Sequence, residues 1–272
     1  MTVADPAHVA SVEAWREERY RRLRNEIGWL TLVGLGWLKP GENRIGSAGD
    51  GDVVLPGGPP IAGTITVPDV GLPTADGEFL HDGAPVRGLP LTSDLAGEPP
   101  LHELGALRLC VIDRGGRLAI RTWDTETPAR TEFDGIDHWP TDPAWRIAAR
   151  LEPAGRTIEI PDVLGATESE VSPGDFVFEV GGETYRLQAL PGGDAGELWL
   201  VFGDATNGRE TYGGGRYLYT DPPDAEGAVV VDFNRAYNPP CVFSPYATCS
   251  LPWPANRLPI RIEAGERAYR SH

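Results

Sequence analysis

Residues that could do chemistry gather in the last third of the sequence, between Asp204 and Glu266. From their types we predict four catalytic residues: Asp232, Tyr237, Cys241 and Glu266. We predict a second set that binds substrate: Asp204, Asn207, Tyr212, Arg216, Asn234, Asn238 and Asn256. Carboxylates that lie beside tyrosine and arginine can be tuned by burial to act as acid or base. The stretch therefore indicates acid–base or hydrolytic chemistry on a polar or anionic small molecule.

Two loops would have to position these side chains. The first, from Asp204 to Arg216, contains three successive glycines, whose backbone N–H groups can converge on an anion. The second, NRAYNPPCVFSPYATCSLPWPANRLP, has no periodic pattern, and loops longer than about 15 residues are usually functional or disordered. Its six prolines and its apolar residues favour an ordered loop. We expect this loop to bring its polar side chains together with Asp232 and Glu266.

A simpler interpretation of the same residues stays open. Arg216 could pair with Asp204 or Asp232 at the end of a glycine-rich turn, without binding a ligand. The asparagines and Asp232 could cap the backbone of the loop, which is the commonest role of such side chains.

Cys241 and Cys249 have seven residues between them and no histidine nearby in sequence, which is outside the usual patterns of structural zinc sites. Three states stay open for them: buried thiols, a disulfide, or a nucleophilic Cys241. A nucleophile would need a base and a favourable charge, for which His138 and Arg216 are the nearest candidates by type. We predict no metal site and no cofactor. The sequence has no Walker A loop, no G-x-S-x-G string and no G-x-G-x-x-G after a strand.

The charge of the chain limits its partners. The formal net charge is −16, which argues against a nucleic acid or an anionic membrane as partner. The N-terminus has no apolar signal core, no apolar run approaches 18 residues, and three cysteines do not make a disulfide framework. We expect a cytoplasmic protein that binds a small molecule, and the oligomeric state stays open.

The pattern of the elements predicts a mainly β fold of antiparallel sandwich or barrel units. High contents of glycine (34) and proline (26) favour short strands with many turns. Alternating segments form two clear hairpins, one about Arg114-Gly115-Gly116 and one about Gly181-Gly182. We also expect a final strand, LPIRIEAGE. An N-terminal amphipathic helix is predicted from Asp5-Pro6 to near Gly28 by its apolar residues Val12, Trp15, Leu23 and Ile27.

A polar, turn-rich stretch over residues 124–145 suggests a domain boundary. We predict an N-terminal helix in residues 1–30 that packs on the body, a β unit in residues 31–125, and a second β unit in residues 126–272 that carries the site. The alternative is one continuous domain in which the stretch is a long loop.

Three segments are similar to a known family. GDATNGRETYGGGRYLY, VVDFNRAYNPPCVFSPYATCSLPWPANRLPIRIEAGE and RNEIGWLTLVGLGWLKPGENRIGS resemble the prokaryotic domain-of-unknown-function family 1684 over nearly the whole chain. One local departure is Cys249-Ser250-Leu251-Pro252, where the family has Cys-Pro-Leu-Pro. The resemblance implies no settled activity.

A second, weaker likeness lies in GENRIGSAGDGDVVLP, which resembles the start of a forkhead-associated phosphopeptide-binding module. Ser47 stands where that module has its phosphate-contacting arginine, so phosphothreonine binding is not expected. Two alternatives to an enzyme therefore remain: a non-catalytic module that binds a small molecule or phospho-ligand, and a β domain for protein interaction.

Overall fold

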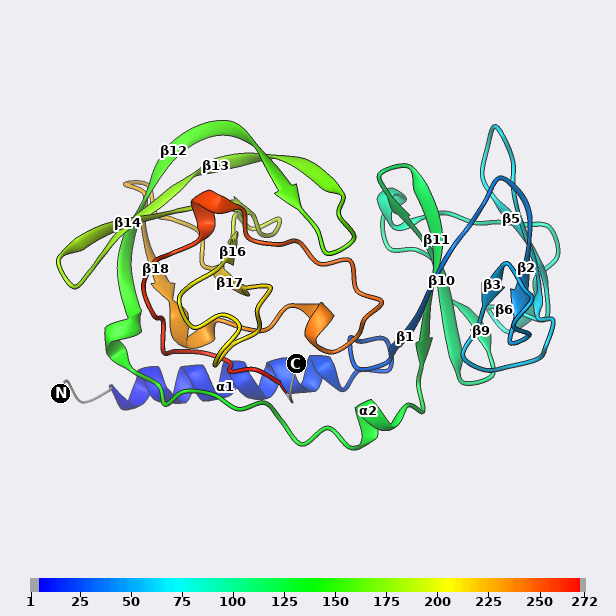
Figure 1. Cartoon of the computed structure of the whole chain (residues 1–272), viewed down its shortest axis with the longest axis horizontal. Coiled ribbons are helices and arrows are strands. Elements are labelled where there is room, and N and C mark those ends of the chain that lie inside the picture. Colours follow the sequence, from blue (N-terminus) through cyan, green and yellow to red (C-terminus); the bar gives the residue numbers. More distant parts are fainter. Residues whose placement is uncertain (1–4, 270–272) are drawn as a thin grey trace. The chain divides into compact units, whose positions relative to one another are not determined.

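Strands dominate the computed structural model, which describes residues 5–269 of the chain (Figure 1). The chain divides into two units. Unit 1 contains the residues up to Tyr20 and those from Asp134 onward, and unit 2 contains Arg21–Phe133. Both units are built from sheets that are antiparallel apart from one short parallel pairing of Ile45 and Gly46 with Val53 and Val54, so the expected mainly β class is confirmed, although no sheet of the described residues closes into a barrel. No helix within residues 5–269 is long and apolar enough to cross a membrane.

The N-terminal helix α1 (Pro6–Leu23) begins where the sequence predicts. The Asp5 carboxylate accepts a hydrogen bond from the Ala7 N–H at 3.0 Å, and Pro6 occupies the first helical position, where its missing N–H costs nothing. The helix ends five residues before the expected Gly28. The chain folds back there, because the Thr31 hydroxyl group bonds both the N–H and the carbonyl of Gly28 at 3.0 Å.

Unit 1 contains two sheets, and side chains of helix α1 bond Asp232 at the end of a strand and Glu266 near the C-terminus. The four-stranded sheet has the order β14-β13-β12-β18, and the three-stranded sheet has the order β15-β16-β17. Their strands are β12 (Arg146–Pro161), β13 (Thr167–Val180), β14 (Glu183–Gln188), β15 (Leu190–Pro191), β16 (Leu198–Phe202), β17 (Arg216–Thr220) and β18 (Ala228–Asp232). The described part of both units also contains five 3-10 turns: Asp94–Ala96, Pro143–Trp145, Phe233–Arg235, Pro240–Val242 and Pro254–Asn256.

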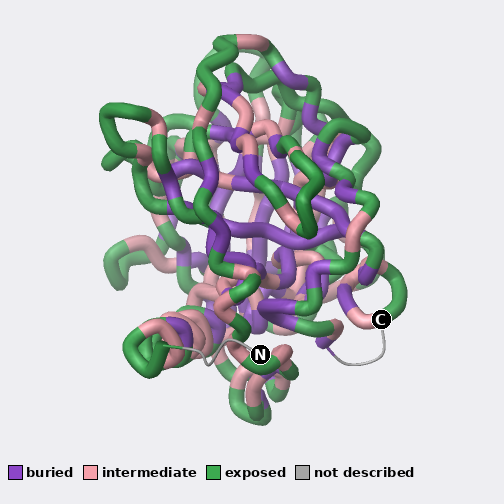
Figure 2. The backbone as a smooth tube through the Cα atoms, turned by 90° about the vertical axis from the view of Figure 1, so that its left-hand side faces the viewer, coloured by how far each residue is buried: buried purple, intermediate pink, exposed green. Residues whose placement is uncertain are grey.

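The core of unit 1 forms between the two sheets. Phe176 from β13, Leu200 from β16 and Phe233 after β18 are fully buried members of one cluster. Figure 2 shows buried backbone concentrated in the strands and exposed backbone in the turns. Strands β12 and β13 are long and carry a register shift between Pro153 and Arg156, and beyond it Ile158 and Ile160 of β12 pack in a second cluster with Val201, Tyr217 and Trp253. The predicted hairpin about Gly181-Gly182 is confirmed as β13–β14.

The expected final strand is wrong in a specific way. Residues 258–266 join no sheet and bend at Pro259, Ile260 and Gly265, although Leu258, Ile262 and Ala264 are buried. The carbonyls of Ile262 and Ala264 accept hydrogen bonds from the Arg216 guanidinium group, at 2.8 Å for Ile262. A side chain therefore satisfies backbone groups that a neighbouring strand would otherwise satisfy.

Unit 2 is a sandwich of a six-stranded sheet, β1-β11-β10-β9-β6-β7, and a five-stranded sheet, β3-β2-β4-β5-β8. The strands are β1 (Leu32–Trp37), β2 (Gly41–Gly46), β3 (Val53–Val54), β4 (Gly63–Val67), β5 (Thr74–Gly77), β6 (Leu80–His81), β7 (Ala84–Pro85), β8 (Leu89–Pro90), β9 (His102–Leu104), β10 (Leu107–Arg114) and β11 (Arg117–Asp124). A short helix, α2 (Pro128–Thr131), follows β11. The predicted hairpin about Arg114-Gly115-Gly116 is confirmed as β10–β11.

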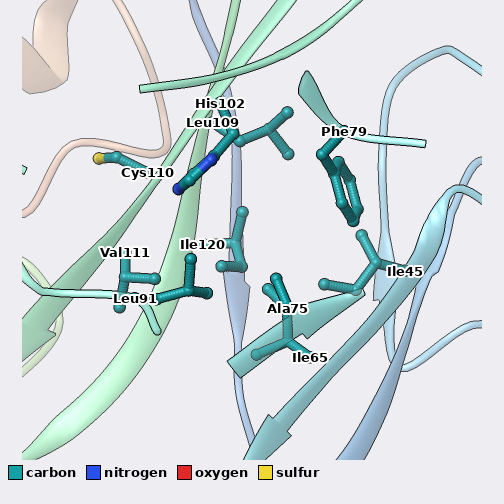
Figure 3. Close-up of a pocket in the computed structure, with 10 residues that line it drawn as sticks. All are labelled: Ile45, Ile65, Ala75, Phe79, Leu91, His102, Leu109, Cys110, Val111 and Ile120. Atoms are coloured by element: carbon teal, nitrogen blue, oxygen red, sulfur yellow. The ribbon is translucent and has the colours of Figure 1, made fainter. Parts of the chain in front are cut away.

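The core of unit 2 holds one small cavity of about 20 Å³ (Figure 3). Aliphatic side chains and Phe79 form most of its wall, together with His102 and Cys110. Burial lowers the pKa of His102 and raises the pKa of the Cys110 thiol to about 12. Both groups are therefore neutral at pH 7, as an apolar core requires. Outside the core, the Ser47 hydroxyl group bonds the Gly58 carbonyl at 2.9 Å.

Candidate functional site

All of the predicted site residues lie in unit 1, but they fall into separate groups rather than around one point. The glycine loop forms the first group. Arg216 is fully buried and bonds Asp204 Oδ2 at 2.7 Å, with both side chains 0% exposed. Asn207 accepts from the Asp204 N–H at 2.6 Å and donates to the Tyr212 carbonyl at 3.0 Å. Arg216 thus holds protein groups together, which is the simpler of the two interpretations of the sequence.

Asp232 anchors the second group. Its Oδ2 lies 2.7 Å from Nε2 of His8 on helix α1, and its Oδ1 accepts from the Asn234 side chain at 2.8 Å. Asn234 also exchanges two hydrogen bonds of 2.9 Å with the backbone of Asp142. These contacts tie the end of β18 to the start of α1 and to the segment that leads into β12.

Glu266 anchors the third group and is 0% exposed. Its carboxylate forms a two-pronged ion pair with Arg19 of helix α1 and accepts from the Asn238 N–H at 2.7 Å. The Arg19 guanidinium group also lies 4.4 Å from the centroid of the Tyr237 ring. Burial raises the pKa of Tyr237, so its hydroxyl group is protonated at neutral pH.

Asn256 has a structural environment. Its Oδ1 accepts from the Gln188 N–H at 2.8 Å, and its Nδ2 donates to the carbonyls of Gln188 and Val201 at 2.9 Å. The side chain therefore completes the backbone hydrogen bonds of β14 and β16, and every polar atom of the amide is used.

The fourth group, which we call the thiol cluster, consists of Tyr212, Tyr217, Cys241 and Cys249. Both cysteines are free, Cys241 is half-buried, and Cys249 is 4% exposed. The Cys241 N–H donates to Cys249 Sγ at 3.0 Å, and the two thiols are hydrogen-bonded to each other. The Tyr212 hydroxyl group is hydrogen-bonded to the Cys241 sulfur. The structure thus brings together Tyr212 and Cys241 from the predicted site residues.

Local structure explains how the thiol cluster forms. Gly215 has a φ of +91°, and a Cβ there would lie 2.6 Å from Pro252 Cγ, so the glycine loop passes directly against the proline-rich loop. Cys241 lies in the 3-10 turn Pro240–Val242, and the carbonyl of Cys249 accepts from the Val163 N–H at 2.9 Å. The hydrogen bond between Tyr217 Oη and the Ser250 carbonyl, at 2.8 Å, fixes the residue that follows Cys249.

The two thiols differ in acidity. Hydrogen bonds from the Cys249 thiol and the Tyr212 hydroxyl group lower the pKa of Cys241 to about 7, against the opposing effect of burial. The same hydrogen bond to Cys241, together with burial, raises the pKa of Cys249. Because the thiolate is the nucleophilic form of cysteine, the lowered pKa of Cys241 favours attack by this sulfur.

His138 does not supply the base that the sequence suggested for Cys241. Its Nδ1 lies 2.7 Å from the Ile136 carbonyl and 3.3 Å from the Tyr20 hydroxyl group. Burial lowers the pKa of His138, which keeps the ring neutral. Within residues 5–269 no three His, Cys, Asp or Glu side chains are arranged to hold a metal ion.

Sequence reasoning missed His8 and Arg19, the partners of Asp232 and Glu266. The signal was present, because His8, Val12, Trp15 and Arg19 follow the i, i+4, i+7, i+11 spacing of one helix face. Because only the apolar residues were taken as the buried face, the two polar side chains at its ends, His8 and Arg19, were overlooked. A basic side chain on the buried face of a helix needs an acidic partner, which points to buried acids elsewhere in the chain.

Comparison with known proteins gives a family and several similar solved structures. The sequence profile of the family described as protein of unknown function (DUF1684) matches residues 131–267, half of the chain. All the predicted site residues lie inside this match, whereas the similar segment in unit 2 lies outside it. An uncharacterised protein of Haloarcula marismortui, solved by NMR in solution, is 29% identical, with a TM-score of 0.45. That likeness covers 54% of this chain and 83% of the other. No curated protein matches the chain.

Proposed function

We propose that this chain, which belongs to the family of proteins of unknown function DUF1684, is a small-molecule enzyme whose nucleophile is Cys241. The observation that carries the proposal is the asymmetric thiol pair in the thiol cluster. Asp232 is hydrogen-bonded to His8 and Glu266 forms an ion pair with Arg19, whereas the Cys241 sulfur is half-buried and accepts hydrogen bonds from a thiol and a hydroxyl group. These contacts favour the thiolate at neutral pH.

The reaction that fits such a thiolate is hydrolysis of an activated acyl compound, such as a small polar ester or thioester. The Cys241 thiolate adds to the acyl carbon, and the leaving group departs and takes a proton from solvent. Water then hydrolyses the thioester, which releases the acid and restores the thiol. Tyr212 stays protonated because burial raises its pKa, so its hydroxyl group can donate to the thiolate and to the developing oxyanion.

The ligand would lie against the outer side of the glycine loop, where Gly213 is exposed beside Tyr212. Arg216 would not contact the ligand, because the Arg216 guanidinium group is neutralised by Asp204 and enclosed in the core. We further propose a cytoplasmic location, since three free cysteines persist most readily in a reducing compartment.

One observation favours the alternative of a non-catalytic binding module. Tyr219 is 50% exposed and stacks on Tyr237, with ring centroids 6.3 Å apart and planes within 8°. Tyr219 also stacks on Trp199, at 6.2 Å. A half-exposed aromatic stack can bind a flat or apolar group without chemistry, and such binding would not depend on the sulfur of Cys241.

The proposal is tested with p-nitrophenyl acetate as an acyl probe. We expect saturable release of p-nitrophenolate, an acetyl group on Cys241 detected by peptide mass spectrometry, and loss of both in Cys241→Ser. The matched control is Cys110→Ala, which removes a buried thiol from unit 2 and should leave the reaction unchanged. A reaction that does not saturate, or that acetylates Cys110 as fast as Cys241, would show that the thiol cluster is not a catalytic site.

A further inference from the structure

Cys249 lies in an unusual position for a buried thiol. Its sulfur accepts a hydrogen bond of 3.0 Å from the backbone N–H of Cys241, and the two side chains are hydrogen-bonded to each other. Only three bonds separate the backbone nitrogen of a cysteine from its own sulfur, so the two sulfurs are direct neighbours. A disulfide needs the two Cα atoms within about 7 Å of each other, and an N–H···S contact of 3.0 Å is compatible with that separation.

The backbone on each side of the pair is fixed independently. Around Cys249, the carbonyl accepts from the Val163 N–H at 2.9 Å, and the Leu251 N–H donates to the Pro161 carbonyl at 2.7 Å. Around Cys241, the N–H of Phe243 donates to the Pro240 carbonyl at 2.9 Å. These hydrogen bonds hold the backbone segments of the two cysteines in place. They do not involve either sulfur, so they can be kept in either redox state.

We propose that Cys241 and Cys249 form a reversible disulfide by exchange with a low-molecular-weight disulfide such as oxidised glutathione. The half-exposed Cys241 is the attacking residue, and the buried Cys249 is the resolving residue. This inference deepens the proposed function by giving its nucleophile a redox control, and it rests on that function only for the loss of activity.

The chemistry balances in two exchange steps. The Cys241 thiolate attacks one sulfur of the oxidant, breaks its S–S bond, and releases one glutathione thiolate. Cys249 then attacks the Cys241 sulfur of the mixed disulfide. Its proton passes to the second glutathione sulfur as that thiol leaves. The protein loses two hydrogens, and one oxidised glutathione becomes two reduced ones, so an excess of reduced glutathione reverses the process.

The difference in acidity between the two thiols matches these roles. The lowered pKa of Cys241 provides thiolate for the first attack, whereas burial and the bond to Cys241 raise the pKa of Cys249. Cys110 in unit 2 is an internal control, because it is buried and burial raises its pKa to about 12. It should stay reduced under the same conditions.

The test uses the full chain in buffers of oxidised and reduced glutathione, followed by acid quenching, unfolding, alkylation with N-ethylmaleimide and mass spectrometry. In excess oxidised glutathione we expect the wild type to lose two alkylation sites, to weigh two hydrogens less than the reduced chain, and to yield a linked Cys241–Cys249 peptide. Cys110 should remain alkylated. Cys249→Ser should stop at a glutathione adduct on Cys241, and Cys241→Ser should react at least tenfold more slowly.

Three results would overturn the proposal: an adduct on Cys241 that persists in the wild type, a bond that includes Cys110, or no loss of alkylation sites. Cys249→Ala replaces Cys249→Ser if a buried hydroxyl group lowers the melting temperature. Because the readout is mass and needs no substrate, a disulfide without acyl transfer refutes only the enzyme. Acyl transfer without a disulfide refutes only the redox control.

Discussion

Removing the Tyr212 hydroxyl group isolates the cause of the acidity of Cys241. Tyr212→Phe keeps the ring and deletes one hydrogen bond to the thiolate, whose pKa in the wild type is about 7. Hydrogen bonds to charged groups contribute roughly 1.5–3 kcal/mol, and about 1.4 kcal/mol corresponds to a factor of ten in ionisation. Taking the lower end for a sulfur acceptor, we expect the variant to ionise about tenfold less readily, with a midpoint near pH 8.

Tyr212→Phe should slow the alkylation of Cys241 at low pH and accelerate it at high pH. At pH 7 the thiolate fraction of Cys241 falls from about one half to about one tenth, but the more basic thiolate is roughly threefold more nucleophilic. The alkylation rate at pH 7 should therefore fall only about twofold, whereas at pH 10 it should rise about threefold. The two pH–rate curves should cross between pH 7 and pH 8.

The assay is the rate of iodoacetamide alkylation at Cys241 from pH 5 to pH 10, followed by peptide mass spectrometry in the native protein. Tyr219→Phe is the matched control, because it deletes a tyrosine hydroxyl group of β17 that is half exposed and stacks on Tyr237. Its curve should coincide with that of the wild type. A wild-type midpoint near 9, or curves for Tyr212→Phe and the wild type that do not cross, would refute the role given to this hydrogen bond.

Two further predictions concern the loops that hold the thiol cluster. Arg216→Met should lower the free energy of unfolding by about 3–5 kcal/mol, measured by thermal denaturation, because it removes the charged partner of the buried Asp204 carboxylate. Adding Asp204→Asn should recover part of this loss. If the effects of the two substitutions were purely additive, the pairing would be contradicted. Gly215→Ala should lower the free energy of unfolding, measured in urea, more than Gly208→Ala. Both glycines have positive φ, but only at Gly215 would an added Cβ lie against Pro252. Equal losses of about 1 kcal/mol would mean that backbone strain alone determines the cost of both substitutions.

The sequence predicted those parts of the fold that depend on local pattern. Both hairpins were found, because alternating side chains on two arms and glycines of positive φ at Gly115, Gly116, Gly181 and Gly182 define a hairpin within about twenty residues. The partners of distant strands, such as β12 with β18, could not be read in this way. The strand expected over residues 258–266 was wrong for a related reason. The alternation of apolar side chains there reflects burial of one face, and burial does not reveal whether the backbone is hydrogen-bonded by a strand or by a side chain.

The sequence indicated which residues could form a site, but it did not predict which of them are in contact. Spacing alone could not tell that Asp232 and Glu266 lie at opposite ends of the buried face of helix α1, near His8 and Arg19. The nearest partner of an acid in sequence is rarely its partner in space. Tyr212 and Cys241 were both named from the sequence, but their contact depends on two loops that meet through Gly215, a tertiary event without a local signal.

Buried charged groups and buried thiols differ in whether they need a partner in the core. Arg216 and Glu266, both fully buried, need partners simply to be tolerated in a core, and each has one. Their presence therefore requires no ligand. A buried thiol is different, because it can remain neutral without any hydrogen bond, as Cys110 does in the core of unit 2. Core packing therefore does not account for the hydrogen bonds made to Cys241, which favour its charged form, and this is why we propose that sulfur as the nucleophile.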